Sequence, residues 1–377
     1  MISCVAIEAA SASSGGAIRY LSQICPALSK ANPDITYYLL NRSTQFAQLP
    51  ALPDNFHWIQ IPNFTQSIPL RLLWLQAKLP SIVKKLNAEV LLAASDVSTL
   101  MPPCPMVLMV HNLNPFSPLR GQIWSHQRIA RMAVHRNLIR GCARRSKKVI
   151  FVSEWSRQAM LPGLAIPLER TAVVSHGVDQ AVEKPPTEDS SSQVQKFILA
   201  VSEVLEHKNL TRLVKAYCKL VQSTNRNVNL VIAGTISSKS LHQSLRSFLA
   251  KQGLSQRVKF LGYVPRNELD ILYQQAELLA FPSLGETFGL PLVEAMAAGL
   301  PVVTSNTTVM PEICGDAVFY FDPLDVADMT WSLTQVLDDP ALRATLIQRG
   351  RERARAFSWS HAAHSLVSIM NEVSHRR

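Results

Sequence analysis

The feature of this sequence that most constrains its fold is a regular alternation of short apolar runs with helical periodicity. The apolar runs are bounded by Gly, Pro or Asn, as buried strands are, and the stretches between them repeat their apolar residues at helical spacing. The alternation stops at residues 180–195, which are rich in Pro, Ser and charged side chains, and restarts at residue 197. This pattern predicts an α/β protein of two doubly wound domains, each with a parallel sheet between helices.

The predicted elements set the domain boundaries. Strands are expected over residues 2–7, 36–40, 57–61, 89–93, 105–110, 148–152, 171–174, 197–201, 228–233, 258–261, 278–281, 302–304 and 318–321. Helices are expected over 17–28, 68–86 with a break near Pro80, 210–222, 240–252, 292–298 and 359–373, with a helical hairpin over 338–355. We therefore predict an N-terminal domain over 1–179, a linker over 180–195, a C-terminal domain over 196–355, and a last helical segment over 356–377 that packs back toward the N-terminal domain.

Composition narrows the class of protein and its compartment. Hydrophobic residues make up 47% of the 377 residues and charged residues 17%, which is typical of globular domains with substantial cores. Six cysteines are scattered without a Cys-x-x-Cys pair, which favours a reducing compartment. No signal-peptide pattern and no apolar run of about 18 residues is seen, so we expect a cytoplasmic protein.

Positive charge is concentrated in an acid-free segment. Residues 97–153 contain no Asp or Glu, and Arg136, Arg140 and Arg144 share one face of a predicted helix there. The alternative to a binding surface is an ordinary solvated helix. The formal charge of +11 implies an anionic partner, and without a nucleic-acid-binding motif we favour acidic lipid headgroups on the inner membrane face.

Residues 281–303 carry the clearest chemical signal. Gly289 permits a tight turn, Pro291 suits a first helical turn, and an apolar helix follows it. A helix N-terminus offers N–H groups and a positive dipole end to a phosphate. Because Glu286 and Glu294 lie beside this anion site, the ligand should also bear hydroxyl groups. A sugar linked to a diphosphate fits both requirements.

Four further residues are candidates because they follow predicted strands, where an α/β sheet binds its ligands. Lys208 follows the strand over 197–201 and could neutralise a diphosphate. Gly15 and Gly16 could let the backbone approach a ligand closely, or could form an ordinary turn. His111 ends the strand over 105–110, where a structural histidine is the alternative.

Together these residues resemble the family-4 group of retaining glycosyltransferases with the GT-B fold. Glu286 and Glu294, eight positions apart around Gly289-Leu-Pro291, match its Glu-x7-Glu signature. The resemblance runs through residues 196–360, with F-L-G-Y-V-P at 260–265, F-P-S at 281–283, P-E-I-C-G-D-A at 311–317 and F-S-W at 357–359. The first half matches more loosely, at G-G with Tyr20, H-N-L with Pro115, V-S-E-W at 152–155 and V-S-H-G-V-D at 174–179.

The resemblance implies a role for each position, in two Rossmann-like domains that face across a cleft. Glu286 would hold donor-sugar hydroxyls, Lys208 the departing diphosphate, Glu294 the ribose and the backbone near Val264 the base. The other implied contacts are to sugar and distal phosphate at Thr287, Phe288, Gly289 and Leu290, to the diphosphate at Gly15 and Gly16, and to the reacting sugar at His111 with Asn112. His207 and Ser202 depart from the family pattern, where Arg and Gly are usual.

The implied activity is a retaining hexosyl transfer in polysaccharide biosynthesis. The branch resembled is the bacterial mannosyl- or rhamnosyl-transferring one, so GDP-mannose is the first choice of donor and a glycan or lipid-linked glycan the acceptor. No Asp-x-Asp triplet is present, which predicts metal-independent catalysis without a cofactor. The alternatives are a transferase that uses UDP-glucose or UDP-N-acetylglucosamine, and a non-catalytic GT-B protein that binds a sugar nucleotide or acts as a scaffold.

Overall fold

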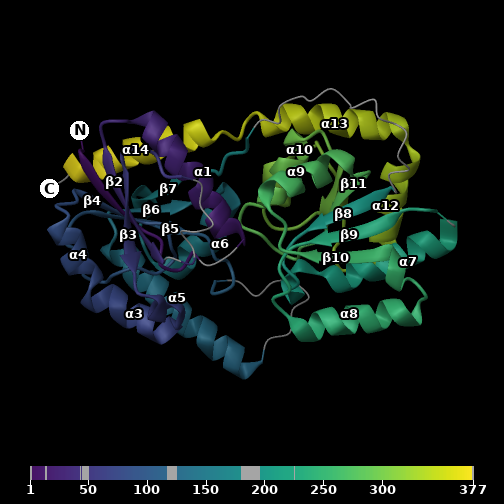
Figure 1. Cartoon of the computed structure of the whole chain (residues 1–377), viewed down its shortest axis with the longest axis horizontal. Helices are drawn as coiled ribbons and strands as arrows, with labels where there is room; N and C mark the ends of the chain where they lie inside the picture. The colour runs from purple at the N-terminus through teal and green to yellow at the C-terminus, as the bar shows by residue number, and fades with distance from the viewer. Residues whose placement is uncertain are drawn as a thin grey trace. The chain divides into compact units, whose positions relative to one another are not determined.

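The computed structural model describes residues 2–12, 15–42, 44, 51–116, 125–179, 196–224 and 226–375. The predicted linker over 180–195 lies outside these residues. The described chain divides into two compact units (Figure 1). The N-terminal unit holds the residues before Val178 together with those from Ser358 onward, and the C-terminal unit holds Val178–Phe357.

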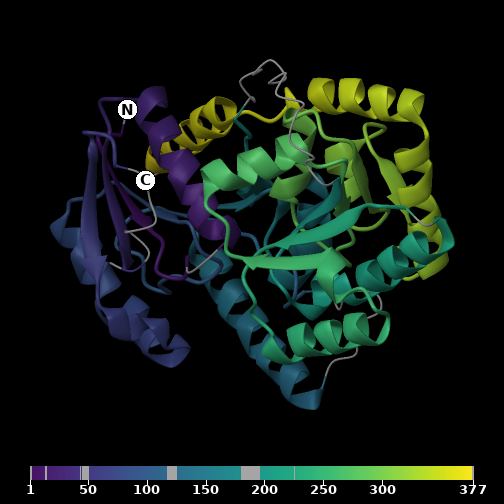
Figure 2. The same ribbon diagram turned by 45° about the vertical axis from the view of Figure 1, so that its right-hand side comes forward.

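The N-terminal unit is built on a seven-stranded parallel sheet. Its order is β3-β2-β1-β4-β5-β6-β7, so the direction of winding reverses between β1 and β4. Helices α1 and α14 lie on one face of this sheet and α3, α4, α5 and α6 on the other (Figures 1 and 2). The strands are β1 (Cys4–Glu8), β2 (Thr36–Arg42), β3 (Phe56–Ile61), β4 (Val90–Ala93), β5 (Met106–Val110), β6 (Lys148–Phe151) and β7 (Thr171–Val173). The helices are α1 (Gly15–Ala31), α3 (Ile68–Ala77), α4 (Leu79–Lys85), α5 (His126–Arg145), α6 (Glu154–Leu164) and α14 (Trp359–His375), with the 3-10 turns η1 (Asn63–Gln66) and η2 (Leu168–Arg170).

The C-terminal unit is built on a six-stranded parallel sheet. Its order is β10-β9-β8-β11-β12-β13, and the winding reverses between β8 and β11. The strands are β8 (Phe197–Val201), β9 (Asn229–Ala233), β10 (Val258–Gly262), β11 (Leu278–Phe281), β12 (Val302–Ser305) and β13 (Phe319–Phe321). The helices are α7 (Leu210–Thr224), α8 (Lys239–Lys251), α9 (Arg266–Gln275), α10 (Leu290–Ala297), α11 (Met310–Cys314), α12 (Val326–Asp338) and α13 (Pro340–Ala354), with η3 (Glu206–Lys208) and η4 (Ser255–Arg257). The predicted α/β class with two doubly wound parallel sheets is confirmed.

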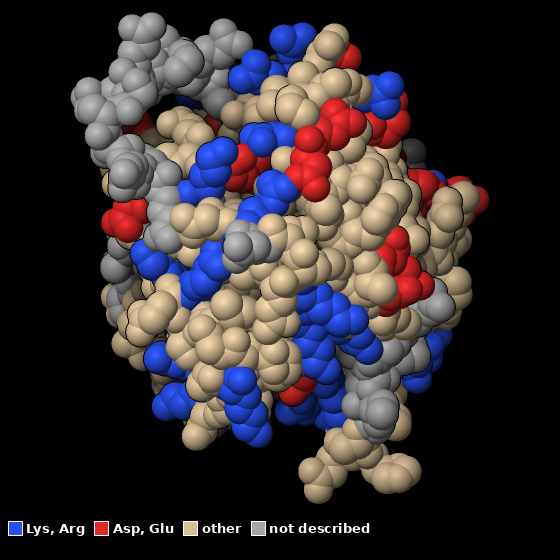
Figure 3. All heavy atoms as spheres, turned by 90° about the vertical axis from the view of Figure 1, so that its right-hand side faces the viewer, with Lys and Arg blue, Asp and Glu red and all other residues tan. Residues whose placement is uncertain are grey.

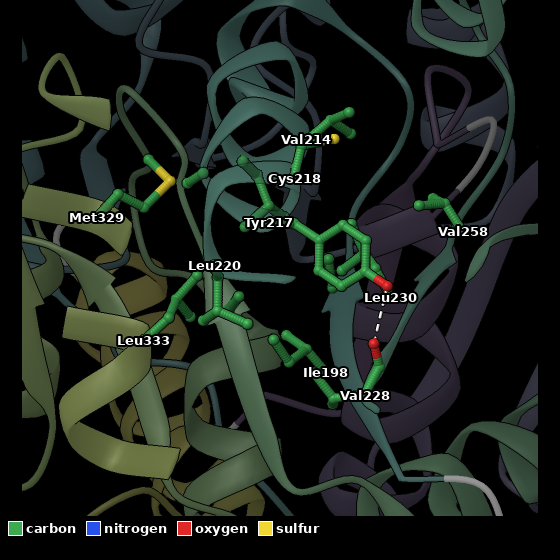
Figure 4. Packing of buried hydrophobic residues seen from close by; sticks show 14 of the residues in the cluster. Ile198, Val214, Tyr217, Cys218, Leu220, Val228, Leu230, Val258, Met329 and Leu333 are labelled. Carbon is green, nitrogen blue, oxygen red and sulfur yellow. Dashed lines mark hydrogen bonds between the residues drawn. The ribbon is translucent and has the colours of Figure 1, made fainter. Parts of the chain in front are cut away.

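Burial on both faces explains why these strands are continuous apolar runs. All residues of β4, β5, β9, β11 and β12 are buried, because helices cover both sides of each sheet. Under α7, α8 and α12, alternate strand residues such as Ile198 and Leu230 meet the apolar face of α7 (Figure 4). Tyr217 of that face donates its hydroxyl to the Val228 carbonyl at 2.8 Å, so its polar end is satisfied within the core.

The helices match the sequence prediction at one predicted break and differ from it in several other places. The break expected near Pro80 is present: α3 ends at Ala77, and Pro80 belongs to the first turn of α4. The hairpin expected over 338–355 is wrong: its first helix is α12, which starts at Val326, and only α13 lies in the expected range. Helix α6 was not predicted, although Ser153 and Ser156 form a capping box at its start.

The last helix belongs to the N-terminal unit. Trp359–His375 packs along α1 and reaches β4 and β5, and Asn371 accepts a hydrogen bond from the backbone N–H of Ile2 at 3.0 Å. Among the helices of the described residues, none is both long enough and apolar enough to cross a membrane.

Candidate active site

Two sequence-predicted residues meet where the winding of the six-stranded sheet reverses. Lys208 lies in the loop after β8 and Glu286 in the loop after β11, and these two strands are neighbours in the sheet. Adjacent parallel strands end at the same edge, so their following loops converge there, as in other doubly wound sheets. The Nζ of Lys208 lies 2.6 Å from the Oε1 of Glu286.

The pair is shielded from water, and its charges support each other. The side chains of Lys208 and Glu286 are only 18% and 16% exposed. Burial raises the pKa of Glu286, but the charge of Lys208 and its hydrogen bond lower it by more, so the pKa lies below its usual value. Glu286 is therefore a carboxylate at neutral pH, able to accept hydrogen bonds from hydroxyl groups.

Asn209 and Thr308 fix the two loops that carry this pair. Asn209 adopts the left-handed conformation at φ 58° and donates its side-chain amide to the carbonyls of Pro282 and Pro323, at 3.1 and 2.7 Å. The Oγ1 of Thr308 accepts from the backbone N–H of Glu286 at 3.2 Å. Sequence reasoning did not single out Asn209, although it directly follows Lys208 and Asn is a common residue at a left-handed position.

The turn after Glu286 leads into the N-terminus of α10. Gly289 has φ 84°, which favours glycine, and a Cβ there would lie 2.8 Å from the Cδ1 of Leu292, whose side chain would have to shift. The side chain of Phe288 is buried and meets the ring of Phe357 edge-on at 5.5 Å. The side chain of Phe288 thus anchors the turn, while Thr287 and Leu290 are half-buried beside it.

Glu294 points into a second polar cluster of the same unit. Its Oε1 pairs with Nη1 of Arg266 at 2.5 Å and its Oε2 accepts from the hydroxyl of Tyr273 at 2.9 Å. Arg266 also pairs with Asp270 at 2.8 Å. Val264 lies two residues before Arg266, in the loop between β10 and α9. Arg266 was not predicted as the partner of Glu294, because the two residues are 28 positions apart and no local pattern links them.

In the N-terminal unit, Asp96 holds the backbone where β5 ends. Its Oδ1 accepts from the N–H groups of His111 and Asn112, at 2.6 and 3.1 Å. The side chain of Asn112 in turn accepts from the N–H of Asn114 at 3.1 Å, an Asx turn that shapes the loop. Asp96 therefore positions both predicted residues, although it was not itself predicted as a site residue.

His111 belongs to a cluster of rings that sequence reasoning did not predict. His111 and His176 stack at 5.6 Å, and Tyr20 of α1 contacts both rings, at 5.8 and 5.0 Å. Trp359 of α14 completes the cluster at 5.9 Å from His176. Burial lowers the pKa of His111 although the charge of Asp96 raises it, and burial and the neighbouring His111 lower the pKa of His176 further. Both imidazoles are therefore neutral near pH 7.

This histidine pair predicts acid sensitivity of the N-terminal unit. In the unfolded chain a histidine has a pKa of about 6.5, above the lowered pKa of each folded residue. As pH falls below 6.5, the unfolded state binds protons first, so the free energy of unfolding should fall with pH. His176→Phe should flatten this dependence between pH 7.5 and 5, as measured by denaturant unfolding at each pH. An equally steep dependence in the variant would contradict the assignment.

Two other groups stand at the same edge of the seven-stranded sheet. Gly15 and Gly16 begin α1, and a Cβ at Gly16 would meet no heavy atom within 4 Å, so packing does not demand glycine at that position. Glu8 ends β1, is fully buried and accepts from the N–H of Ala10 at 2.7 Å. Burial, only partly offset by hydrogen bonds and the charge of Arg71, raises the pKa of Glu8 to about 7.

The arginine face predicted on the basic helix is largely engaged within the unit. The Nε of Arg140 donates to the Gly163 carbonyl of α6 at 2.9 Å. Arg136 is half-buried, and of the three only Arg144 is exposed. Helical spacing alone gives no indication of which face of α5 is covered by α6. Elsewhere among the described residues, no three His, Cys, Asp or Glu side chains are grouped as metal ligands.

Two protein families match consecutive parts of the chain. Residues 14–182 match the family described as Glycosyltransferase Family 4, and residues 183–353 match the family described as Glycosyl transferases group 1. Anabaena Alr3699/HepE, solved in complex with UDP and glucose, has the same fold, with a TM-score of 0.77 at 20% identity over 98% of this chain and 100% of that one.

Curated relatives are more similar in sequence, over part of the chain. The O-antigen chain mannosyltransferase B of Escherichia coli is 30% identical over 233 residues, which cover 59% of this chain and 60% of the relative. The serotype-specific mannosyltransferase WbdA of the same organism is 29% identical over 232 residues, which cover 59% of this chain and 28% of the relative. The two family matches run together from residue 14 to residue 353, and the chain belongs to the family-4 glycosyltransferases of the GT-B fold.

Proposed function

We propose that this protein is a retaining glycosyltransferase that moves a hexose, with mannose from GDP-mannose as first choice, to a glycan or lipid-linked glycan acceptor in polysaccharide biosynthesis. The observation that carries the proposal is the Lys208–Glu286 pair, which lies where the sheet reverses its winding and just before the N-terminus of α10. A cation and a helix N-terminus suit a diphosphate, and a carboxylate suits sugar hydroxyls.

In the proposed reaction the donor replaces the contact between Lys208 and Glu286. The diphosphate takes the ammonium of Lys208 and the α10 N-terminus, with the backbone of Thr287 to Leu290 around the distal phosphate and sugar. Glu286 accepts from the sugar hydroxyls. As the bond between the anomeric carbon and the diphosphate oxygen breaks, these groups stabilise the negative charge that develops on the leaving group.

The acceptor oxygen forms its new bond on the face that the diphosphate leaves, so the anomeric configuration is retained. A leaving phosphate oxygen takes the proton of the acceptor hydroxyl, and Lys208 carries the neutralising charge in place of a metal ion. Glu286 serves as a sugar-binding group and not as a nucleophile. A glycosyl ester on Glu286, trapped and detected by mass spectrometry, would contradict this assignment.

Ribose and base are assigned to the second cluster of the C-terminal unit. Glu294 would accept from the ribose hydroxyls, and the backbone near Val264 would read the base. Acceptor binding is assigned to the N-terminal unit, where His111 and Asn112 would position the reacting sugar and Gly15 with Gly16 would approach the diphosphate. The support is their position at strand ends, where α/β sheets bind ligands.

The choice of donor rests on named relatives and has an alternative. Three similar proteins are named as mannosyltransferases: the O-antigen chain mannosyltransferase B and the serotype-specific mannosyltransferase WbdA of Escherichia coli, and the MMP α-(1→4)-mannosyltransferase of Mycolicibacterium hassiacum. Anabaena Alr3699/HepE was solved with UDP-glucose, which keeps a UDP-sugar as the alternative donor. A non-catalytic sugar-nucleotide-binding scaffold is the alternative function, and release of nucleotide in the presence of lipid-linked acceptors would exclude it.

A panel of nucleotide sugars tests the donor. A ligand that binds only the folded protein stabilises it by about 2.7 kcal/mol at a hundred times its Kd. We expect GDP-mannose to raise the Tm most, by several degrees, with UDP-glucose and UDP-N-acetylglucosamine showing smaller shifts. The measurement is thermal unfolding at equal ligand concentrations, with mannose alone as the control. A larger shift with UDP-glucose would reassign the donor.

We also propose a cytoplasmic location with an anionic membrane surface as partner, peripheral on the inner face, and no nucleic acid. The sequence suggested Arg136, Arg140 and Arg144 as the contact. Because Arg140 is bonded to the Gly163 carbonyl, the contact is better sought elsewhere in the N-terminal unit.

A further inference from the structure

Helix α3 exposes an apolar stripe to solvent. Leu70 and Leu73 are 44% and 65% exposed, and Ile68 and Phe64, at the start of the helix and in the preceding turn, are 59% and 53% exposed. We call these four residues the α3 face. Residues 70, 73 and 77 lie three and four positions apart, so Leu70, Leu73 and Ala77 form one continuous row on the outside of the helix.

This row is unusual because α3 already buries an apolar side. Trp74 and Leu75 are buried in the unit. A helix that covers a sheet normally turns polar residues outward, and scattered exposed apolar residues need no explanation. Four large, exposed apolar side chains within ten consecutive residues are not scattered, and such a patch marks an interaction surface.

The charge around the α3 face is equally uneven. Residues 55–153 contain 13 Lys and Arg but only two Asp and Glu, a formal charge of +11. The remaining residues contain 25 of each kind, so this segment carries the whole excess charge of the chain. Its two acids are occupied: Glu89 accepts from the N–H and hydroxyl of Ser3, and Asp96 from two backbone N–H groups.

The fold places this positive charge on the side of the sheet where α3 lies. Helices α3, α4 and α5 cover the sheet face opposite α1 and α14 (Figures 1 and 2). Their exposed cations on this side are Lys78 just before α4, Lys84 and Lys85 at its end, and Arg131 on α5. Arg144, Arg145 and Lys147, at and after the end of α5, line a pocket with Glu372 of α14 instead. By contrast, the face in Figure 3 carries both signs.

We propose that the α3 face, flanked by these cations, docks the protein on a lipid bilayer with anionic headgroups. Apolar side chains between basic residues are the pattern of helices that lie in the membrane interface, about 5–10 Å deep. Leu70 and Leu73 enter the acyl boundary, while Lys78, Lys84 and Lys85 reach the headgroup phosphates.

Neither of the two other occupants suits both the positive charge and the apolar side chains of this surface. A second copy of this chain would bring two such positive segments face to face, which is repulsive. Nucleic acid would satisfy the cations but leaves aliphatic side chains without a partner, since bases stack on aromatic rings. An anionic bilayer offers phosphate groups to the cations and acyl chains to the apolar side chains. The inference does not rest on glycosyl transfer, because docking needs neither donor nor acceptor.

The test compares vesicle binding of matched variants. The full chain should co-sediment with vesicles of phosphatidylethanolamine and phosphatidylglycerol and much less with pure phosphatidylcholine. Leu70→Gln/Leu73→Gln keeps helix propensity and should weaken binding at least tenfold. Lys78→Gln/Lys84→Gln/Lys85→Gln should weaken it about tenfold and make it less sensitive to salt. The control is Trp331→Gln, because Trp331 is 53% exposed on α12 of the C-terminal unit.

Two outcomes would overturn the proposal. One is unchanged vesicle binding by Leu70→Gln/Leu73→Gln with an unchanged Tm. The other is a parent protein that is dimeric by analytical ultracentrifugation, becomes monomeric in this variant and binds no vesicles, which would identify a second copy as the occupant. Donor-induced Tm shifts, measured in parallel, report the proposed transferase site separately from docking.

Discussion

Replacing Lys208 by methionine should lower kcat by about 1000-fold while changing the KM for the donor much less. Methionine keeps the length and apolar surface of the side chain but removes the ammonium. The charge on the leaving diphosphate grows as the glycosidic bond breaks, so the interaction with Lys208 is stronger in the transition state than in the bound donor. Steady-state kinetics with donor varied at saturating acceptor gives both constants.

The contact between Lys208 and Glu286 makes a second substitution informative. Glu286→Gln keeps the shape and some hydrogen bonding but removes the negative charge that faces Lys208. We expect kcat to fall about 100-fold or more, again with a smaller change in donor KM. Because the two residues lie 2.6 Å apart in the structure and act on the same bound donor in the proposed reaction, the double variant should be much less impaired than the product of the two single losses predicts.

The control for these single and double variants is Lys215→Met, because Lys215 is an exposed lysine of α7 in the same unit. It should leave both constants unchanged. Unchanged Tm values for Lys208→Met and Glu286→Gln would show that the losses are catalytic. A loss of less than tenfold in kcat for Lys208→Met would rule out this lysine as the main group that neutralises the leaving diphosphate.

The elements that were predicted correctly are those whose structure is determined by residues within the same short segment. The apolar runs of β4, β5, β9 and β11 are buried on both faces, and burial forces continuous apolar sequence whatever the rest of the chain does. The turn at Gly289 also has a local cause. Glycine adopts a positive φ more easily than other residues do, so the residue type alone predicted the turn. By contrast, α12 was missed, although Asp325 caps its start through the N–H groups of Ala327 and Asp328.

The parts of the site that could not be predicted depend on contacts between distant residues. Lys208 and Glu286 were each singled out, but their contact follows only from β8 and β11 being neighbours in the sheet. The stacking of His111 on His176, with Trp359 against His176, needs three segments to converge on one place. The exposed apolar row on α3 was also not predicted. From sequence alone, an apolar helix is interpreted as buried, and only the structure shows which of its sides packs against the sheet.

The second large effect is expected at Arg266, and it is an effect on stability. The side chain of Glu294 is only 6% exposed, and Arg266 is its cationic partner. Removing one member of a buried ion pair leaves the other charge buried and uncompensated, which is strongly destabilising. Because Arg266 is 32% exposed and the Tyr273 hydroxyl still donates to Glu294, we expect Arg266→Ala to lower the free energy of unfolding by about 2–3 kcal/mol. Asp270→Asn, which removes the 44% exposed partner of Arg266, is the control and should change it by less than about 1 kcal/mol.

A second substitution separates the structural role of Glu294 from its proposed role in donor binding. In Arg266→Ala/Glu294→Gln no buried charge remains, so most of the lost stability should return. The ribose would still lack its carboxylate, so the Kd for GDP should stay about tenfold or more above that of the parent protein. Urea unfolding gives the first quantity and calorimetric titration with GDP the second. Recovery of GDP affinity together with stability would mean that Glu294 only holds α9 against α10, and the ribose contact would then have to be sought elsewhere in the C-terminal unit.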